Sequence, residues 1–100
     1  MTANIPNKIR QSIYRRDGWR CAICDSPRGL QIHHVVHRSH GGNDTPHNLI
    51  TLCWRCHAIA HGTRLPECPA YMDAVEMGQA CVEYVADLYA GVWWPYEEGF

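Results

Sequence analysis

Apolar residues recur at four-residue steps near the start of the chain. The positions are Ile5, Ile9 and Ile13. Because residues four apart lie on one face of a helix, this pattern predicts a short amphipathic helix with Asn4 as its cap. The other face carries basic residues that contact either phosphates or solvent. These residues are Lys8, Arg10, Arg15 and Arg16.

Two later segments, residues 30–36 and 49–52, have the residue types of β-strands. Successive side chains of a regular strand point to opposite faces, so His33 and His34 are expected on opposite sides of the first strand. Between the strands, residues 37–47 contain Gly41-Gly42 and several other turn-forming residues, and they predict a loop.

Two helices are predicted after the second strand. The first follows Cys53 and runs through His61 to a stop at Gly62, which puts His57 and His61 on one face. A linker at residues 65–69 leads to a longer helix over residues 70–90. Its expected apolar positions are Tyr71, Val75, Val82, Val85 and Tyr89.

Charge divides the chain near residue 64. Residues 1–64 carry nine Lys and Arg against three Asp, a net charge of +6, whereas residues 65–100 carry seven acids and no Lys or Arg. A basic segment suits a polyanion such as nucleic acid, and the alternative is an ordinary solvated surface.

The length of 100 residues suits one small domain, which often needs a staple to be stable. No stretch approaches the roughly 20 apolar residues of a membrane span, and the first residues lack the pattern of a signal peptide. We therefore expect a soluble, cytoplasmic protein without a membrane partner. In a reducing compartment, paired cysteines are better explained by metal binding than by disulfides.

Four of the six cysteines form two Cys-x-x-Cys pairs, with 28 residues between the pairs. The pairs are Cys21 with Cys24, and Cys53 with Cys56. Four thiolates from two such pairs can surround one tetrahedral Zn²⁺ ion, so the spacing favours a structural zinc over disulfides or unrelated thiols. Cys68 and Cys81 lack this spacing and are expected to be ordinary buried or free thiols.

All seven histidines lie between His33 and His61, inside the window that the cysteine pairs bracket. A catalytic metal needs a few protein ligands, an open position and a base that can act on water. The predicted helix supplies His57 and His61. The strand end supplies His33 and His34, one of which is expected to bind a metal while the other faces a water. The alternative is that one or two of these histidines are capping or core residues.

The sequence from Ile32-His33-His34, through Asn48, to Cys53-x-x-Cys56-His57-x-x-x-His61 resembles the HNH endonucleases. The likeness is to their four-cysteine branch, which is frequent among phage and restriction proteins. It implies an α+β fold with a small ββα-metal (His-Me finger) core and a four-cysteine structural zinc. A helix at each end of the chain would flank this core.

The resemblance also implies roles for individual residues. His34 would be the general base, and His33 and His57 would be ligands of the catalytic ion. By likeness to the colicin-type nucleases, His61 would be a further ligand. Asn48 would brace the loop that orients the base, and a loop carbonyl near Asn48 is expected to bind the second nitrogen of His34.

The implied activity is hydrolysis of DNA phosphodiester bonds, by nicking or double-strand cleavage, to leave 5′-phosphate and 3′-hydroxyl ends. Mg²⁺, Mn²⁺ or Ni²⁺ would serve as the catalytic ion. Phosphate contacts are expected from Arg38, Arg55 and Arg64, with plain solvent exposure as the alternative. Many family members have a proline where His37 stands. The default for His37, His40 and His47 is that they are solvated loop residues.

The resemblance predicts a nuclease core with zinc knuckles over residues 1–64. Residues 65–100 would form an acidic helical extension that packs on the core or on a partner, or acts as an oligomer interface. Phage members of the family work beside a terminase large subunit, which makes such a machine an implied partner. The rival interpretation is a non-catalytic zinc module that binds nucleic acid or protein.

Overall fold

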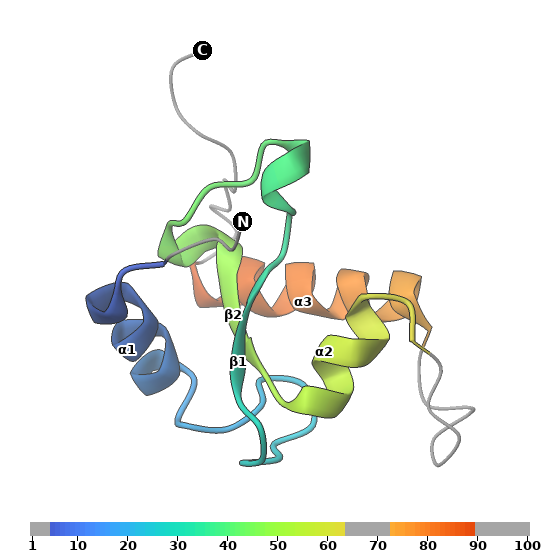
Figure 1. Cartoon of the computed structure of the whole chain (residues 1–100), viewed down its shortest axis with the longest axis horizontal. Coiled ribbons are helices and arrows are strands. Elements are labelled where there is room, and N and C mark those ends of the chain that lie inside the picture. The colour runs from blue at the N-terminus through green and yellow to red at the C-terminus, as the bar shows by residue number, and fades with distance from the viewer. Residues whose placement is uncertain (1–4, 64–72, 90–100) are drawn as a thin grey trace.

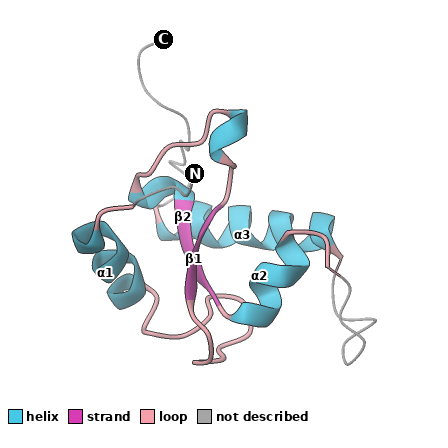
Figure 2. Cartoon of the chain, in the orientation of Figure 1, coloured by secondary structure: helices cyan, strands magenta, loops and turns pink. Residues whose placement is uncertain are grey.

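The computed structural model describes residues 5–63 and 73–89 of the chain. At its centre, β1 (Gln31–His34) and β2 (Leu49–Leu52) form an antiparallel two-stranded sheet, in which Gln31 pairs with Leu52 and His34 with Leu49. Helix α2 (Trp54–Ala60) follows β2 after a single residue. The segment from β1 to α2 is thus a ββα unit, as Figures 1 and 2 show. The predicted α+β fold, with a helix before and a helix after this unit, is confirmed.

Helix α1 (Asn7–Arg16) buries Ile13 and Tyr14. The predicted cap is wrong, because the N-cap residue is Pro6, whose side chain has no group to accept a backbone N–H. Asn4, the predicted cap, lies outside the described residues. Proline fits there because its fixed backbone angle suits the approach to a helix.

Strand β1 is shorter than the predicted strand. It ends at His34 because the next two residues bond to Asn48 instead of extending the ladder: Val35 N–H donates to the Asn48 carbonyl, and Val36 bonds to the Asn48 side chain. The predicted loop contains two short 3₁₀ helices, η1 (Arg38–His40) and η2 (Pro46–Asn48).

Helix α3 (Ala74–Leu88) passes behind the sheet and α2 in the view of Figure 1. It begins with a capping box, in which Asp73 accepts from the Glu76 N–H and Glu76 accepts from the Asp73 N–H. Its buried residues recur every four positions. They are Met77, Cys81 and Val85, and each is fully buried in one core with Ile50, Leu52 and Ile59. Val75, one of the apolar positions of the predicted helix, is 77% exposed.

An ion pair between Arg16 and Asp17 joins both outer helices to the sheet. The Arg16 guanidinium donates to both Asp17 oxygens, at 2.8 and 3.0 Å, and to the Leu49 carbonyl at 2.7 Å. Asp17 also accepts from the Thr51 N–H and from the Tyr84 hydroxyl, each at 2.9 Å. Arg16 therefore holds the fold together and is not the free surface cation that the helix pattern predicted.

Within the described residues, no helix is both long and apolar enough to cross a membrane.

Candidate metal centre and active site

The two Cys-x-x-Cys pairs meet where the β2–α2 junction faces the chain after α1. All four sulfurs lie within 4.8 Å of one another, and Cys24 Sγ is 3.5 Å from Cys53 Sγ. Four thiolates at about 2.3 Å from one zinc ion would have sulfur–sulfur distances of about 3.8 Å. Cys21, Cys53 and Cys56 are buried, and Cys24 is exposed. The donor type and spacing therefore fit a tetrahedral zinc.

Backbone amides aim at the sulfurs in both pairs. The N–H groups of Ile23 and Cys24 donate to Cys21 Sγ, and the Cys56 N–H donates to Cys53 Sγ. The hydrogen bond from the Cys56 thiol, aided by these amides, lowers the pKa of Cys21 to about 4. Burial raises the pKa of Cys24 to about 11. The amides and the neighbouring thiol thus favour the thiolate of Cys21, and a bound cation would favour ionisation of the other three.

Three histidines form a second cluster at the end of β1 and along α2. Candidate ligand nitrogens of His33, His57 and His61 lie within 4.8 Å of one another, and the Nε2 atoms of His57 and His61 are 3.2 Å apart. The spacing of four residues on α2 brings the last two together, as predicted. Three convergent imidazoles with an exposed His61 offer an incomplete ligand shell that is open to solvent.

Two of these imidazoles, His33 and His57, are favoured in their neutral, metal-binding form. Burial, followed by the nearby His57 and His61, lowers the pKa of His33 to about 3. Burial also lowers the pKa of His57, with smaller effects from His61 and His37. A neutral ring has a free lone pair, so His33 and His57 can bind a cation without first losing a proton.

Asn48 joins the two ends of the loop between the strands. It is fully buried, and its Oδ1 accepts from the Val36 N–H at 2.8 Å, while its Nδ2 donates to the carbonyls of Val36 and Asn43, each at 2.9 Å. The side-chain amide of Asn48 therefore makes three hydrogen bonds to the backbone beyond the end of β1, where the strand pairing has stopped. Gly42 packs against this joint: an added Cβ would lie 1.8 Å from the Val36 carbonyl oxygen.

His34 points to a different neighbour from His33. Its Nε2 lies 2.6 Å from Oδ1 of Asp44, in the middle of the same loop. The sequence predicted a loop carbonyl as the partner of His34, but a carboxylate takes this place. Asp44 was missed, although it is the only acidic residue between Asp25 and Glu67 and so the only one inside the histidine window.

The comparison with known families agrees with this geometry. Residues 21–63 match the family model described as HNH endonuclease. This region is an HNH endonuclease family domain. It contains both clusters, Asn48 and Asp44. No curated protein matches the chain.

Two of the three remaining loop histidines, His37 and His47, differ from the predicted solvated loop residues. His37 is half-buried, and its ring centroid lies 5.6 Å from that of His33 and 5.4 Å from that of His61. His47 lies 4.1 Å from the ring of Tyr89, just past α3. His40 alone of these three is exposed, as expected.

The three arginines predicted to contact phosphate differ in their surroundings. The Arg55 guanidinium lies 5.4 Å from the Trp54 ring at the start of α2, and its Nε is buried. Arg38 belongs to η1, and Arg64 lies outside the described residues. Cys81 is a buried free thiol, as predicted, while Cys68 also lies outside the described residues.

Proposed function

We propose that this protein is a metal-dependent endonuclease that hydrolyses DNA phosphodiester bonds. One observation carries the proposal: inside an HNH domain, three imidazoles converge at one point, and the neighbouring His34 is held by a carboxylate. A set of metal ligands alone would suit a binding module. A set of metal ligands beside an oriented imidazole is what a hydrolase needs.

His33, His57 and His61 would hold the catalytic ion. Their donor set fits a divalent cation, and the observed Nε2–Nε2 distance of 3.2 Å is close to the about 3.3 Å expected for two nitrogens on one tetrahedral ion. When bound, the ion would stabilise negative charge on the phosphoryl group and the leaving oxygen. The described residues leave the His61 side of the cluster exposed, where a phosphate can approach.

His34 would act as the general base. If its Nε2–H donates to Asp44, the ring is fixed in the tautomer whose Nδ1 carries the lone pair. Nδ1 can then take a proton from a water that attacks phosphorus in line, leaving 5′-phosphate and 3′-hydroxyl ends. The carboxylate also stabilises the imidazolium that forms.

Asn48 would keep this base in place without touching the substrate. It binds residue 36, two positions after His34, and residue 43, one position before Asp44. Both partners of the His34–Asp44 contact are thus fixed through the same buried amide. This is the brace that the resemblance implies.

The four cysteines would hold a structural zinc. Their sulfurs form a closed set, with three of the four residues buried. The zinc would fix the start of α2, and with it His57 and His61, one to two turns further along the same helix.

The DNA substrate agrees with the net charge of +6 on residues 1–64. So small a domain can contact only a few base pairs, which favours action as a dimer or beside a larger DNA-processing machine such as a terminase. Phosphate contacts from Arg38, Arg55 and Arg64 stay predictions.

The test is cleavage of supercoiled plasmid by zinc-loaded protein with Mg²⁺, Mn²⁺ or Ni²⁺ added in turn. We expect nicked or linear DNA with at least one of these ions, and a loss of cleavage in His57→Ala. The exposed His40→Ala serves as a matched histidine control and should cleave normally. A folded, zinc-bound wild type that binds DNA but cleaves with none of the ions would favour the rival, a non-catalytic zinc module.

A further inference from the structure

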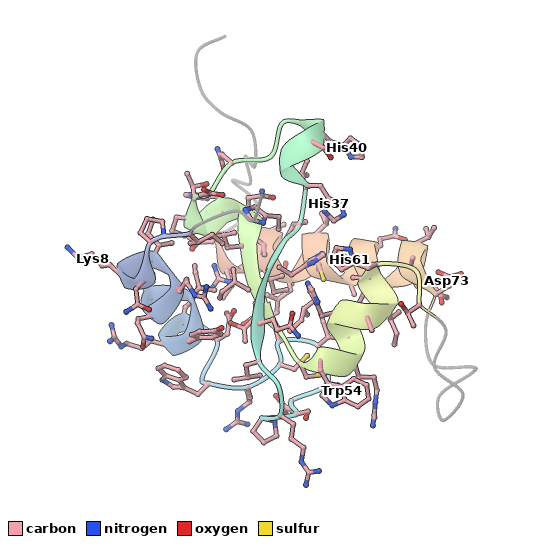
Figure 3. The ribbon with its side chains drawn as sticks, in the orientation of Figure 1. Lys8, His37, His40, Trp54, His61 and Asp73 are labelled. Atoms are coloured by element: carbon pink, nitrogen blue, oxygen red, sulfur yellow. The ribbon has the colours of Figure 1, made fainter. Side chains whose placement is uncertain are left out.

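His37 stands beside the three-histidine cluster, although the sequence gave it no role. It follows β1 in the chain, and the backbone there is fixed: the His37 carbonyl accepts from the N–H groups of His40 and Gly42, at 2.9 and 3.0 Å. Its ring reaches back towards α2. Figure 3 shows the side chain between those of His40 and His61.

The ring spacings are those of imidazoles around a common point. The centroid distances are 5.3 Å for His33 with His57, 5.3 Å for His33 with His61 and 4.5 Å for His57 with His61. His37 lies 5.6 Å from His33 and 5.4 Å from His61. Four imidazoles on one tetrahedral ion, with metal–nitrogen bonds of about 2.0–2.1 Å, would have centroids about 5 Å apart.

We propose that His37 is a fourth imidazole ligand of this metal centre, so that the DNA-free domain selects a transition ion such as Zn²⁺, Co²⁺ or Ni²⁺ over Mg²⁺. This inference rests on the proposed function, because it takes His33, His57 and His61 as the metal site. The nitrogens of His37 lie outside the 4.8 Å group that these three form, so the His37 ring must turn towards them on binding.

The selectivity follows from ligand chemistry. Mg²⁺ prefers oxygen ligands and keeps much of its water, whereas imidazole suits zinc, nickel and cobalt. A fourth imidazole in place of a water would strengthen this preference. Because His37 sits on the loop and not on β1 or α2, it is also the ligand that can leave most easily when a phosphate oxygen arrives.

The experiment is a titration of Co²⁺, and separately of Mg²⁺, into protein whose cysteine site is already filled with zinc, without DNA. Calorimetry gives the affinity, and the visible absorption of Co²⁺ reports its coordination, because four-coordinate Co²⁺ absorbs more strongly than six-coordinate Co²⁺. The variants are His37→Ala, His37→Gln, His57→Ala and the neighbouring His40→Ala. Thermal melting checks that each variant is folded.

We expect His37→Ala and His37→Gln to weaken Co²⁺ binding by at least about tenfold, since even loss of an indirect partner of a metal ligand costs about 10–100-fold. The absorption should weaken as water replaces the ring, and Mg²⁺ binding should change little. His40→Ala should match the wild type.

Two failures can be told apart. If both His37 variants bind Co²⁺ with wild-type affinity and spectrum while His57→Ala does not, this inference is overturned and the proposed function stands. If His57→Ala also binds as the wild type does, the three-histidine cluster is not the metal site, and both proposals fall.

Discussion

The cysteine cluster takes Cys53 and Cys56 from the start of α2, and the histidine cluster takes His57 and His61 from the residues that follow, yet the two clusters are built in opposite ways. The cysteine cluster is closed: three of its four residues are buried within the main core, where Met77, Cys81 and Val85 of α3 also pack. The histidine cluster is open, because His57 is half-buried and His61 is exposed. A structural metal needs a complete shell, and a catalytic metal needs a vacant position.

In this small chain, stability and chemistry thus depend on two separate clusters. The buried cysteines belong to the hydrophobic core, so a metal bound to their sulfurs would act as part of that core. The histidines lie at the edge of the same sheet and helix, where the segment between β1 and η2 supplies His37 and Asp44. Damage to the two clusters should therefore have separable consequences.

The largest expected effect is that of Cys56→Ala. Removing one buried sulfur should abolish zinc binding and unfold the domain, since structural zinc contributes about 10–16 kcal/mol in zinc-finger peptides. Zinc content and far-ultraviolet circular dichroism would measure this. His57→Ala is the matched variant one position along α2, and it should keep both its zinc and its fold. A Cys56→Ala protein that is zinc-free yet melts at the wild-type temperature would contradict the structural role of the cysteine cluster.

Asn48→Ala should come next, with a loss of about 3 kcal/mol or more in the free energy of unfolding. Three backbone groups of Val36 and Asn43 would lose their partner in a buried place, and each such group costs about 1–3 kcal/mol. Urea denaturation gives the value, with Asn7→Ala at the exposed start of α1 as control. Equal stabilities of the two variants would mean that Asn48 does not brace the loop.

A smaller effect on stability, but a large one on cleavage, is expected for Gly42→Ala. The new Cβ would meet the Val36 carbonyl oxygen at 1.8 Å and Asn48 Nδ2 at 2.8 Å, so the loop that carries Asp44 must shift. We expect a cost of about 1–3 kcal/mol in stability and a cleavage rate at least tenfold lower.

Gly78→Ala is the matched control for Gly42→Ala. Apart from its own chain neighbours and the adjacent α3 backbone, no atom of the described residues lies within 4 Å of its added Cβ, and in the interior of α3 alanine should stabilise the protein by about 0.5–1 kcal/mol. Cleavage by Gly42→Ala at the Gly78→Ala rate would show that the loop position does not matter for catalysis.

The smallest effect is expected at Tyr84, whose role is structural only. Tyr84→Phe loses the hydroxyl that donates to Asp17, and we expect about 1–2 kcal/mol less stability with unchanged cleavage. Burial and this hydrogen bond raise the pKa of Tyr84 to about 12.

The raised pKa of Tyr84 gives a pH dependence with a definite sign. Because the pKa in the folded protein is above the ordinary value of about 10, the stabilisation is complete below pH 10 and is lost as the pH rises towards 12. Urea denaturation across this window should show a smaller loss in Tyr84→Phe than in the wild type. Parallel curves would argue against the contact with Asp17.

Much of the fold was predictable because its signals are local. The Cys-x-x-Cys pairs, the strand-type residues of β2 and the four-residue spacing of His57 and His61 each encode geometry within a few residues. The contact between Asp44 and His34 spans ten residues of irregular loop, whose conformation no periodicity reports. Asp44 could be suspected only as the lone acid among the histidines.

The other misses also depend on tertiary structure. Arg16 has the pattern of a surface cation on α1, but it binds the neighbouring Asp17 and also Leu49 and Tyr89 from two other parts of the fold. In α3, the capping box at Asp73 sets where the helix starts, and packing of Met77 on the core then turns Val75 outward. Helix periodicity predicted the element but not which of its apolar residues face inward.

The most direct test of the histidine cluster as the active site is the single-turnover cleavage rate of His34→Ala, with DNA fully bound and zinc in the cysteine site. We expect a rate at least about 10²-fold below the wild type, as for loss of a general base, with the melting temperature, zinc content and DNA affinity unchanged. A folded His34→Ala protein that cleaves bound DNA at the wild-type rate would contradict the assignment of the open histidine cluster as the active site.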